Sequence, residues 1–190
     1  MSNYSYNSTL FSLRAAGPTL TAAAAASMLV AASPLAGQVR PTIPAGTLAY
    51  GTMLQFRAYG IISCVVTTPG TARFDFRLGS TVVYDTGALN LNIIAKTNVP
   101  WHLQVLMAVR SEGATTAATF WSQVLFVSEA VIAAALPAAG SNGILNAPVS
   151  GVAASTGFDS TIANVFDSFF TQTVATGSMT CELAELSLLN

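Results

Sequence analysis

Apolar and polar residues alternate with a period of two through most of the chain after residue 52. Successive side chains of a β-strand point to opposite faces, so this alternation predicts strands with one buried face and one exposed face. It recurs over residues 53–66, 73–78 and 101–110. The residues expected between the sheets are Phe56, Phe74, Phe76, Trp101, Leu103 and Val105.

Turn sequences separate these runs, and further strand-like runs cover residues 81–85, 116–127, 165–174 and 179–188. The turns are Thr68-Pro69-Gly70, Gly79-Ser80 and the segment 111–114, all built from residues that favour turns. Seven to nine strands joined by hairpin-like turns, without alternating helices, predict an all-β fold. We expect an antiparallel β-sandwich of jelly-roll type.

The first 37 residues do not share this pattern. We expect residues 1–37 to form an extended N-terminal arm with an Ala-rich segment, and residues 38–190 to form the sandwich. Residues 19–32, with five consecutive alanines, predict either a short helix or an edge strand. The arm carries apolar side chains among Ser, Asn and Thr, which predicts docking on a neighbouring subunit; a disordered terminus is the alternative. The predicted anchors are Tyr4, Tyr6, Leu10 and Phe11.

The composition indicates that the surface of this sandwich is covered by other molecules. Charged residues make up 8% of the chain and hydrophobic residues 52%, whereas charged residues make up about 25% of an average soluble protein. The longest apolar stretches, residues 21–32 and 131–139, are shorter than the roughly 20 residues of a membrane-spanning helix. We therefore expect no membrane insertion. We expect instead that the surface of the chain is buried in an assembly, with a homotrimer as first choice.

The sequence contains little that could perform chemistry. Its seven basic residues form no cluster that would bind phosphates, so we expect no direct nucleic-acid binding. His102 is the only histidine, and Cys64 and Cys181 are expected to be buried free thiols. Glu182 and Glu185 are expected on opposite faces of the last strand. We predict no catalytic residues, no metal site and no cofactor, and hence no enzyme.

One charged stripe stands out in this charge-poor chain. Arg73, Asp75 and Arg77 alternate with apolar residues, so all three are expected on one face of one strand. Asp75 could neutralise the arginines and support pairing with the next strand. Alternatively, the stripe could be a contact between subunits. The sequence leaves both interpretations open.

Three segments together resemble a group of small jelly-roll structural proteins, of head or decoration type, from the virions of tailed bacteriophages. They are residues 43–48 (IPAGTL), residues 76–87 (FRLGSTVVYDTG), and residues 101–110 followed by a turn of small residues. The resemblance covers roughly residues 38–190. It implies a sandwich that trimerises or caps a lattice on the particle, with no catalytic residues to carry over.

These observations favour a structural virion protein that is capsid-associated, a decoration or minor head protein. Its expected partners are copies of itself and the major capsid protein or other virion proteins. The alternative is a tail, baseplate or fibre component whose sandwich binds a receptor or a glycan. The first residues show no secretory signal, so we expect assembly into virions in the bacterial host cytoplasm.

Overall fold

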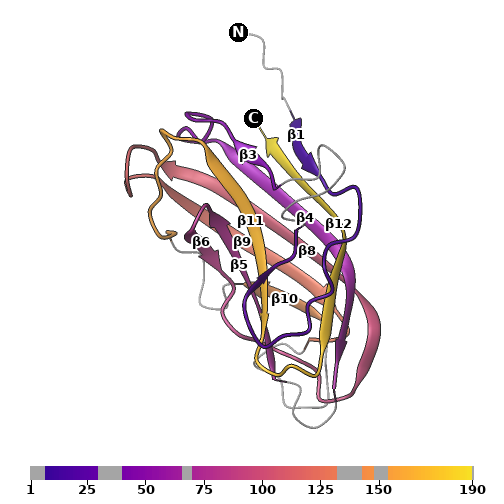
Figure 1. Cartoon of the computed structure of the whole chain (residues 1–190). Coiled ribbons are helices and arrows are strands. Elements are labelled where there is room, and N and C mark those ends of the chain that lie inside the picture. Colours follow the sequence, from indigo (N-terminus) through magenta and orange to yellow (C-terminus); the bar gives the residue numbers. More distant parts are fainter. Residues whose placement is uncertain (1–6, 30–39, 66–69, 132–142, 148–153, 190) are drawn as a thin grey trace.

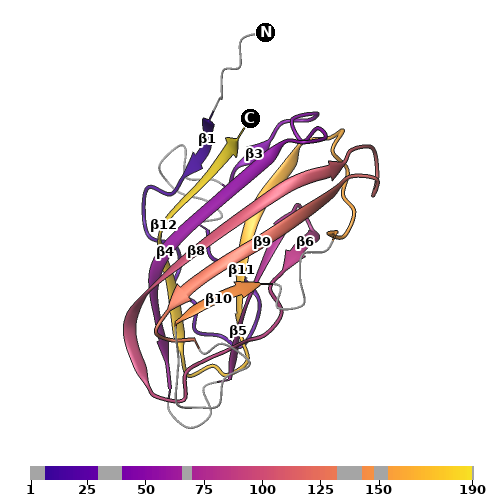
Figure 2. The same cartoon turned by 180° about the vertical axis from the view of Figure 1, so that it is seen from behind.

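A computed structural model describes residues 7–29, 40–65, 70–131, 143–147 and 154–189. Throughout this part of the chain the regular structure is β, and none of it forms a helix long and apolar enough to cross a membrane. The strands form two antiparallel sheets packed face to face (Figures 1 and 2). The predicted all-β antiparallel sandwich is confirmed.

The large sheet has the order β1-β12-β4-β8-β9-β10 and faces the viewer in Figure 2. Its strands are β1 (Asn7–Ser12), β4 (Met53–Cys64), β8 (Lys96–Ser111), β9 (Thr119–Ser128), β10 (Ile144–Ala147) and β12 (Ser178–Leu189). The small sheet has the order β2-β11-β5-β6, and β3 and β7 pair with β11 and β5. Its strands are β2 (Ala26–Ser27), β3 (Thr42–Ile43), β5 (Thr71–Leu78), β6 (Thr81–Asp85), β7 (Leu89–Asn90) and β11 (Asn164–Gln172).

An aromatic core fills the space between the sheets. Phe74 of the small sheet lies 4.9 Å, between ring centroids, from Phe126 of the large sheet, and Phe56 lies 5.3 Å from Phe166. All six predicted core residues are almost completely buried, which confirms the predicted face assignment. Burial of such side chains is the main favourable contribution to folding, at about 1.5–3 kcal/mol for a large apolar side chain.

Residues 7–29 differ from the predicted arm, because they belong to the sandwich of their own chain. β1 pairs with β12 along the edge of the large sheet. The backbone N–H groups of Leu13, Gly17 and Leu20 continue this pairing by donating to carbonyls of β12. An unpaired edge strand would leave backbone groups unsatisfied, and this segment supplies the partners for β12. The described part of the chain therefore shows no boundary between an arm and the sandwich before residue 29.

The Ala-rich segment, as far as residue 29, forms no helix. It forms a bend and then the short strand β2, which pairs with β11 of the small sheet. Gly17 allows the preceding segment to pack tightly here, since a Cβ at this position would lie 2.2 Å from the carbonyl oxygen of Met28. The segment thus passes from the edge of one sheet to the edge of the other.

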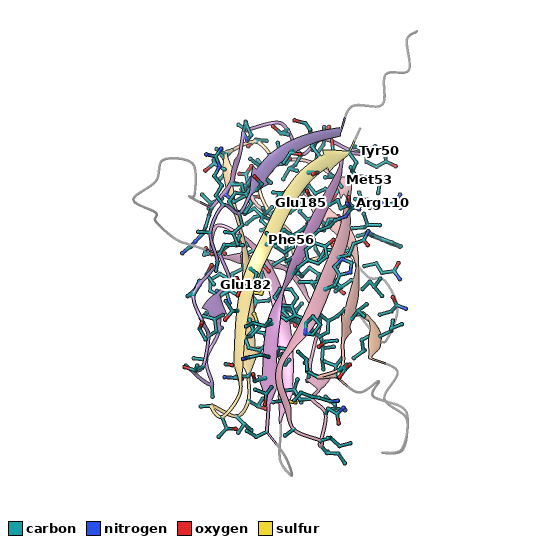
Figure 3. The ribbon with its side chains drawn as sticks, turned by 90° about the vertical axis from the view of Figure 1, so that its right-hand side faces the viewer. Tyr50, Met53, Phe56, Arg110, Glu182 and Glu185 are labelled. Atoms are coloured by element: carbon teal, nitrogen blue, oxygen red, sulfur yellow. The ribbon has the colours of Figure 1, made fainter. Side chains whose placement is uncertain are left out.

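A β-bulge in β12 corrects one further expectation. The register between β12 and β4 shifts between Cys181 and Leu183, so Glu182 is an extra residue without a partner on β4. Cys181 therefore points into the core while Leu183 points outward and is 60% exposed. Glu182 and Glu185 both reach solvent, and the expectation that they face opposite sides of the sheet is wrong (Figure 3).

Candidate interaction surface

The outer faces of the two sheets carry different kinds of side chain. We call the outward-facing residues of β5, β6 and β11, together with Arg40, the small-sheet face. The outward-facing residues of β4, β8, β9, β10 and β12, together with Tyr50, are the large-sheet face. The small-sheet face holds three ion pairs between arginines and carboxylates. They are Arg73–Asp85, Arg77–Asp75 at 2.5 Å, and Arg40–Asp167 at 2.8 Å.

The stripe predicted at 73, 75 and 77 lies on the small-sheet face, and its members have partners within the chain. Asp75 pairs with Arg77, and Arg73 pairs with Asp85 on the neighbouring strand β6. The guanidinium of Arg77 also lies 3.7 Å from the ring centroid of Phe169. The chain thus uses these charges to hold β5 against β6 and β11, and a contact between subunits at this stripe stays a prediction.

Asp167 is the most buried carboxylate of the small-sheet face. Burial raises the pKa of its carboxyl group, while the hydroxyl of Ser27 and the Arg40 cation act in the opposite direction. The Ser27 hydroxyl donates to Asp167 Oδ1 at 2.6 Å, and the Ser168 backbone N–H donates at 2.8 Å. This carboxylate therefore connects β2, β11 and the chain at residue 40.

The large-sheet face, in contrast, carries exposed apolar side chains at both ends. One end holds what we call the aromatic patch, formed by Tyr50, Met53 and Trp121. Tyr50 is 69% exposed and Trp121 is 44% exposed. Arg110 lies beside the patch, with its guanidinium 5.5 Å from the Trp121 ring centroid. Figure 3 shows Tyr50, Met53 and Arg110 close together at this end of the sheet.

The other end holds an apolar groove of about 430 Å³. The Tyr59 and His102 rings, which are cross-strand partners, stack there with centroids 4.5 Å apart and planes 4° from parallel. Val127 lies beside His102 on the next strand. The groove is lined mainly by Tyr59, Pro100, His102, Val127, Glu129 and Ile144.

His102 contributes the polar atom of this groove. Its Nε2 is buried and has no hydrogen-bond partner in the described part of the chain. Burial lowers the pKa of the imidazole, and the nearby Arg57 cation lowers it further. The ring is therefore neutral at pH 7, which leaves the groove without a charge at its centre. The predicted surface or interface histidine does lie on the outer face of β8.

A polar band separates the groove from the aromatic patch. It contains the pair between Arg57 and Glu185, with 3.4 Å between nitrogen and oxygen and both side chains 41% exposed. The neighbouring outward positions are mostly uncharged amides, namely Gln55, Gln104 and Gln123. At this exposure the ion pair contributes little to stability, because solvent screens it.

The residues predicted as arm anchors lie elsewhere. Phe11 is 7% exposed and belongs to the core of its own chain, and Leu10 packs against that core. Phe11 was expected to contact another subunit, and the pairing of β1 with β12 places it in the core instead. A subunit contact at the half-buried Leu10 stays a prediction. Tyr4 and Tyr6 lie outside the described residues.

The large-sheet face was not predicted from the sequence. Its signal was present as large apolar residues at positions where the alternation calls for polar ones. These residues are Tyr59, Leu106, Trp121, Leu125 and Val127.

The residues that the structure describes contain no group of side chains suited to hold a metal ion. No three histidines, cysteines or carboxylates come together there in a way that could hold a metal ion. Cys64 and Cys181 are buried free thiols, as predicted. Burial raises the pKa of Cys181 to about 12, with the Glu182 charge adding to the effect. This thiol therefore stays protonated near neutral pH.

Neither a protein-family model nor a curated protein matches the chain. Among solved structures, the chain is similar to the CBM2 module of the evolved Dit protein of Lactobacillus casei BL23 phage J-1. The two chains are 12% identical, with 98% of this chain and 97% of that chain covered and a TM-score of 0.36. At this score the similarity carries no argument about function.

Proposed function

We propose that the chain is a non-enzymatic structural subunit of a tailed-phage virion that packs against neighbouring subunits through its large-sheet face. The observation that carries the proposal is the contrast between the two outer faces. The small-sheet face neutralises its charges internally, whereas the large-sheet face leaves Tyr50, Tyr59, Trp121 and Leu183 exposed. Exposed apolar surface that is rimmed by polar residues is typical of a protein interaction site.

Two features of the sequence support a place in a virion. Only 8% of the residues are charged, which suits a surface covered by other subunits. The turn and strand segments described above resemble jelly-roll head or decoration proteins. The proposal therefore includes a jelly-roll type for the sandwich, a capsid-associated location and assembly in the host cytoplasm. Its partners would be copies of the chain, with the trimer as the sequence-based first choice, and the major capsid or other virion proteins.

A second candidate function is a tail, baseplate or fibre component that binds a receptor or a glycan. The aromatic patch favours it, because Tyr50 and Trp121 are exposed next to Arg110 and Gln123. Binding sites for small ligands combine aromatic surface with a few polar groups in this way. Titration with oligosaccharides, followed by tryptophan fluorescence, would change the Trp121 signal under this candidate and leave it unchanged under the first.

A cryo-EM map of particles that contain this chain tests the proposal. We expect density for the sandwich at regular positions on the head, with the large-sheet face against a neighbouring subunit. Density confined to the tail would favour the second candidate. A map in which the large-sheet face is exposed to solvent in every copy would contradict the proposed packing surface.

A further inference from the structure

The aromatic patch and the groove lie on the same strands at a fixed separation. Met53 and Tyr59 are six residues apart on β4, Ala108 and His102 on β8, and Trp121 and Val127 on β9. Six residues of a β-strand span roughly 20 Å. The register makes each set a row across the sheet. One row contains Met53, Ala108 and Trp121, and the other contains Tyr59, His102 and Val127.

The two rows are symmetric about a line across the sheet. Their midpoints are Phe56 on β4, Val105 on β8 and Val124 on β9, and these three residues are themselves cross-strand partners. A rotation of 180° about an axis parallel to this line, above the large-sheet face, brings a second copy face to face with the first. Each strand then crosses its own counterpart in the opposite direction, and each row lies over the other row of the partner subunit.

We propose that the large-sheet face is a two-fold interface between two copies of this chain, in which Trp121 of each copy enters the groove of the other. This inference rests on the proposed function, because it names the partner of the same packing surface. Under the rotation, Trp121 lies over Val127 of the partner subunit, Ala108 lies over His102, and Met53 lies over Tyr59.

Trp121 suits the groove in chemistry as well as position. Its indole offers a large apolar surface and a single N–H donor. The groove offers apolar walls and the buried Nε2 of His102, which has no hydrogen-bond partner in the described residues and can accept from an N–H when the ring is neutral. Such aromatic side chains in desolvated pockets supply much of the binding energy of protein interfaces.

Charges on the face are complementary under the same rotation. Arg110 of one copy lies over Pro100 of the other, and Pro100 and Glu129 both line the groove. The Glu129 side chain is 70% exposed at the rim of the groove and pairs with Lys96 of its own chain at 3.1 Å. Each Arg110 thus comes near a Glu129 of the partner subunit. The Arg57–Glu185 pairs of the two copies lie next to the axis, where their charges sum to zero.

The face is also large enough for a stable dimer. The five strands of the large-sheet face, spaced about 4.8 Å apart and taken over the nine residues from Met53 to Ile61, cover roughly 700 Å². A typical specific interface buries about 800 Å² on each partner. A two-fold contact closes after two copies, so it gives dimers, or hexamers if trimers also form through another surface.

Charge complementation in sedimentation-velocity experiments at micromolar concentration tests the pairing of positions 121 and 127. We expect Trp121→Arg and Val127→Asp each to weaken self-association at least 10-fold, because each places a charge against an apolar partner in both halves of the interface. Mixing the two variants should restore association. The mixed dimer places the new arginine against the new aspartate in one half and keeps the native pair in the other.

Two controls and one replacement variant accompany this experiment. Val165→Arg introduces the same charge on the small-sheet face, at a position of similar exposure (39% against 44%), and should leave association unchanged. Circular dichroism melts establish that each variant folds. If Val127→Asp does not fold, Ile144→Asp, at the cross-strand neighbour of Val127 in the groove, replaces it.

Leu183→Arg separates failure of this inference from failure of the proposed function. Leu183 lies on the large-sheet face, so its substitution should weaken any packing through that face. If Leu183→Arg abolishes association but the mixture of Trp121→Arg and Val127→Asp stays monomeric, the two-fold pairing is wrong and the packing surface stands. If wild-type protein is monomeric, or if none of these variants weakens association, the two-fold interface is overturned. The proposed function then fails only if the cryo-EM map also shows the large-sheet face exposed to solvent in every copy.

Discussion

The two outer faces of this sandwich use opposite chemistry, although both belong to sheets that share one core. The small-sheet face carries six charged side chains in three ion pairs, each between residues of this chain. The large-sheet face has a half-exposed pair at its centre, the Lys96–Glu129 pair beside the groove, and exposed apolar side chains at both ends.

This difference indicates what each face is suited to do. A face whose charges already have partners gains little electrostatic energy from a second molecule. A face with exposed apolar side chains gains about 25 cal/mol for each Å² of apolar surface removed from water. The distribution of charge, more than its total amount, therefore identifies the surface available for assembly.

Removing the core that the two faces share should have the largest effect. Phe76 is fully buried and packs edge-on against Phe56 of the opposite sheet, with ring centroids 5.8 Å apart. Phe76→Ala should lower the free energy of unfolding by about 3–5 kcal/mol, measured by urea denaturation. The exposed Val165→Ala should change it by less than about 0.5 kcal/mol. A loss below about 1 kcal/mol at Phe76 would contradict the packing described.

The edge of the large sheet should be the next most sensitive region. Phe11→Ala should cost about 3 kcal/mol, at the low end for a buried phenylalanine because β1 is an edge strand. Deletion of residues 1–14 should lower the melting temperature of the isolated protein for the same reason. A truncated protein that melts at the wild-type temperature would show that these residues are an arm independent of the sandwich.

The ion pairs of the two faces should differ in strength. Asp167→Asn leaves Arg40 without its buried partner and should cost about 1–3 kcal/mol. Glu185→Gln removes the exposed partner of Arg57 and should cost at most about 1 kcal/mol. Both changes keep the shape of the side chain, so each is the control for the other in thermal or urea denaturation. Equal losses would remove the distinction between the faces.

Much of the fold follows from the period-two pattern. The seven strands expected from it correspond to β4, β5, β6, β8, β9, β11 and β12. The strands β1, β3, β7 and β10 escaped prediction because they are short or edge strands. β2 lies within residues 19–32, where an edge strand was one of the two predicted alternatives. Such strands are held by pairing with a distant partner, as β1 is by β12, and a local pattern does not contain that partner.

The candidate surface was harder to predict than the core. Alternation places Tyr59 and Trp121 on the outer face of their strands. Strand pairing decides that they belong to two rows across the sheet, which are separated by six residues along each strand. The charged stripe at 73–77 was visible in the sequence, whereas Asp85, the partner of Arg73, comes from another strand. The bulge at Glu182 depends on the register with β4, which no residue of β12 specifies alone.

A small pH effect should distinguish the groove from the rest of the large-sheet face. The folded pKa of His102 lies below its ordinary value, so the unfolded chain takes up a proton first as the pH falls. The stability that this group contributes is complete above the unfolded pKa, near 6.5, and is lost as the pH falls through the folded pKa. Between pH 7.5 and 5.5, wild type should lose slightly more stability in urea melts than His102→Gln. An identical loss in both proteins would show that His102 does not titrate as described.

Hydroxyl-radical footprinting as a function of protein concentration tests the claim about the two faces most directly. Met53, Tyr59 and Trp121 report on the large-sheet face, and Phe169 reports on the small-sheet face. We predict that oxidation of the first three falls as the protein associates, while oxidation of Phe169 stays constant. If Phe169 becomes protected while Met53, Tyr59 and Trp121 stay equally reactive at every concentration, the small-sheet face is the interface and the account is wrong.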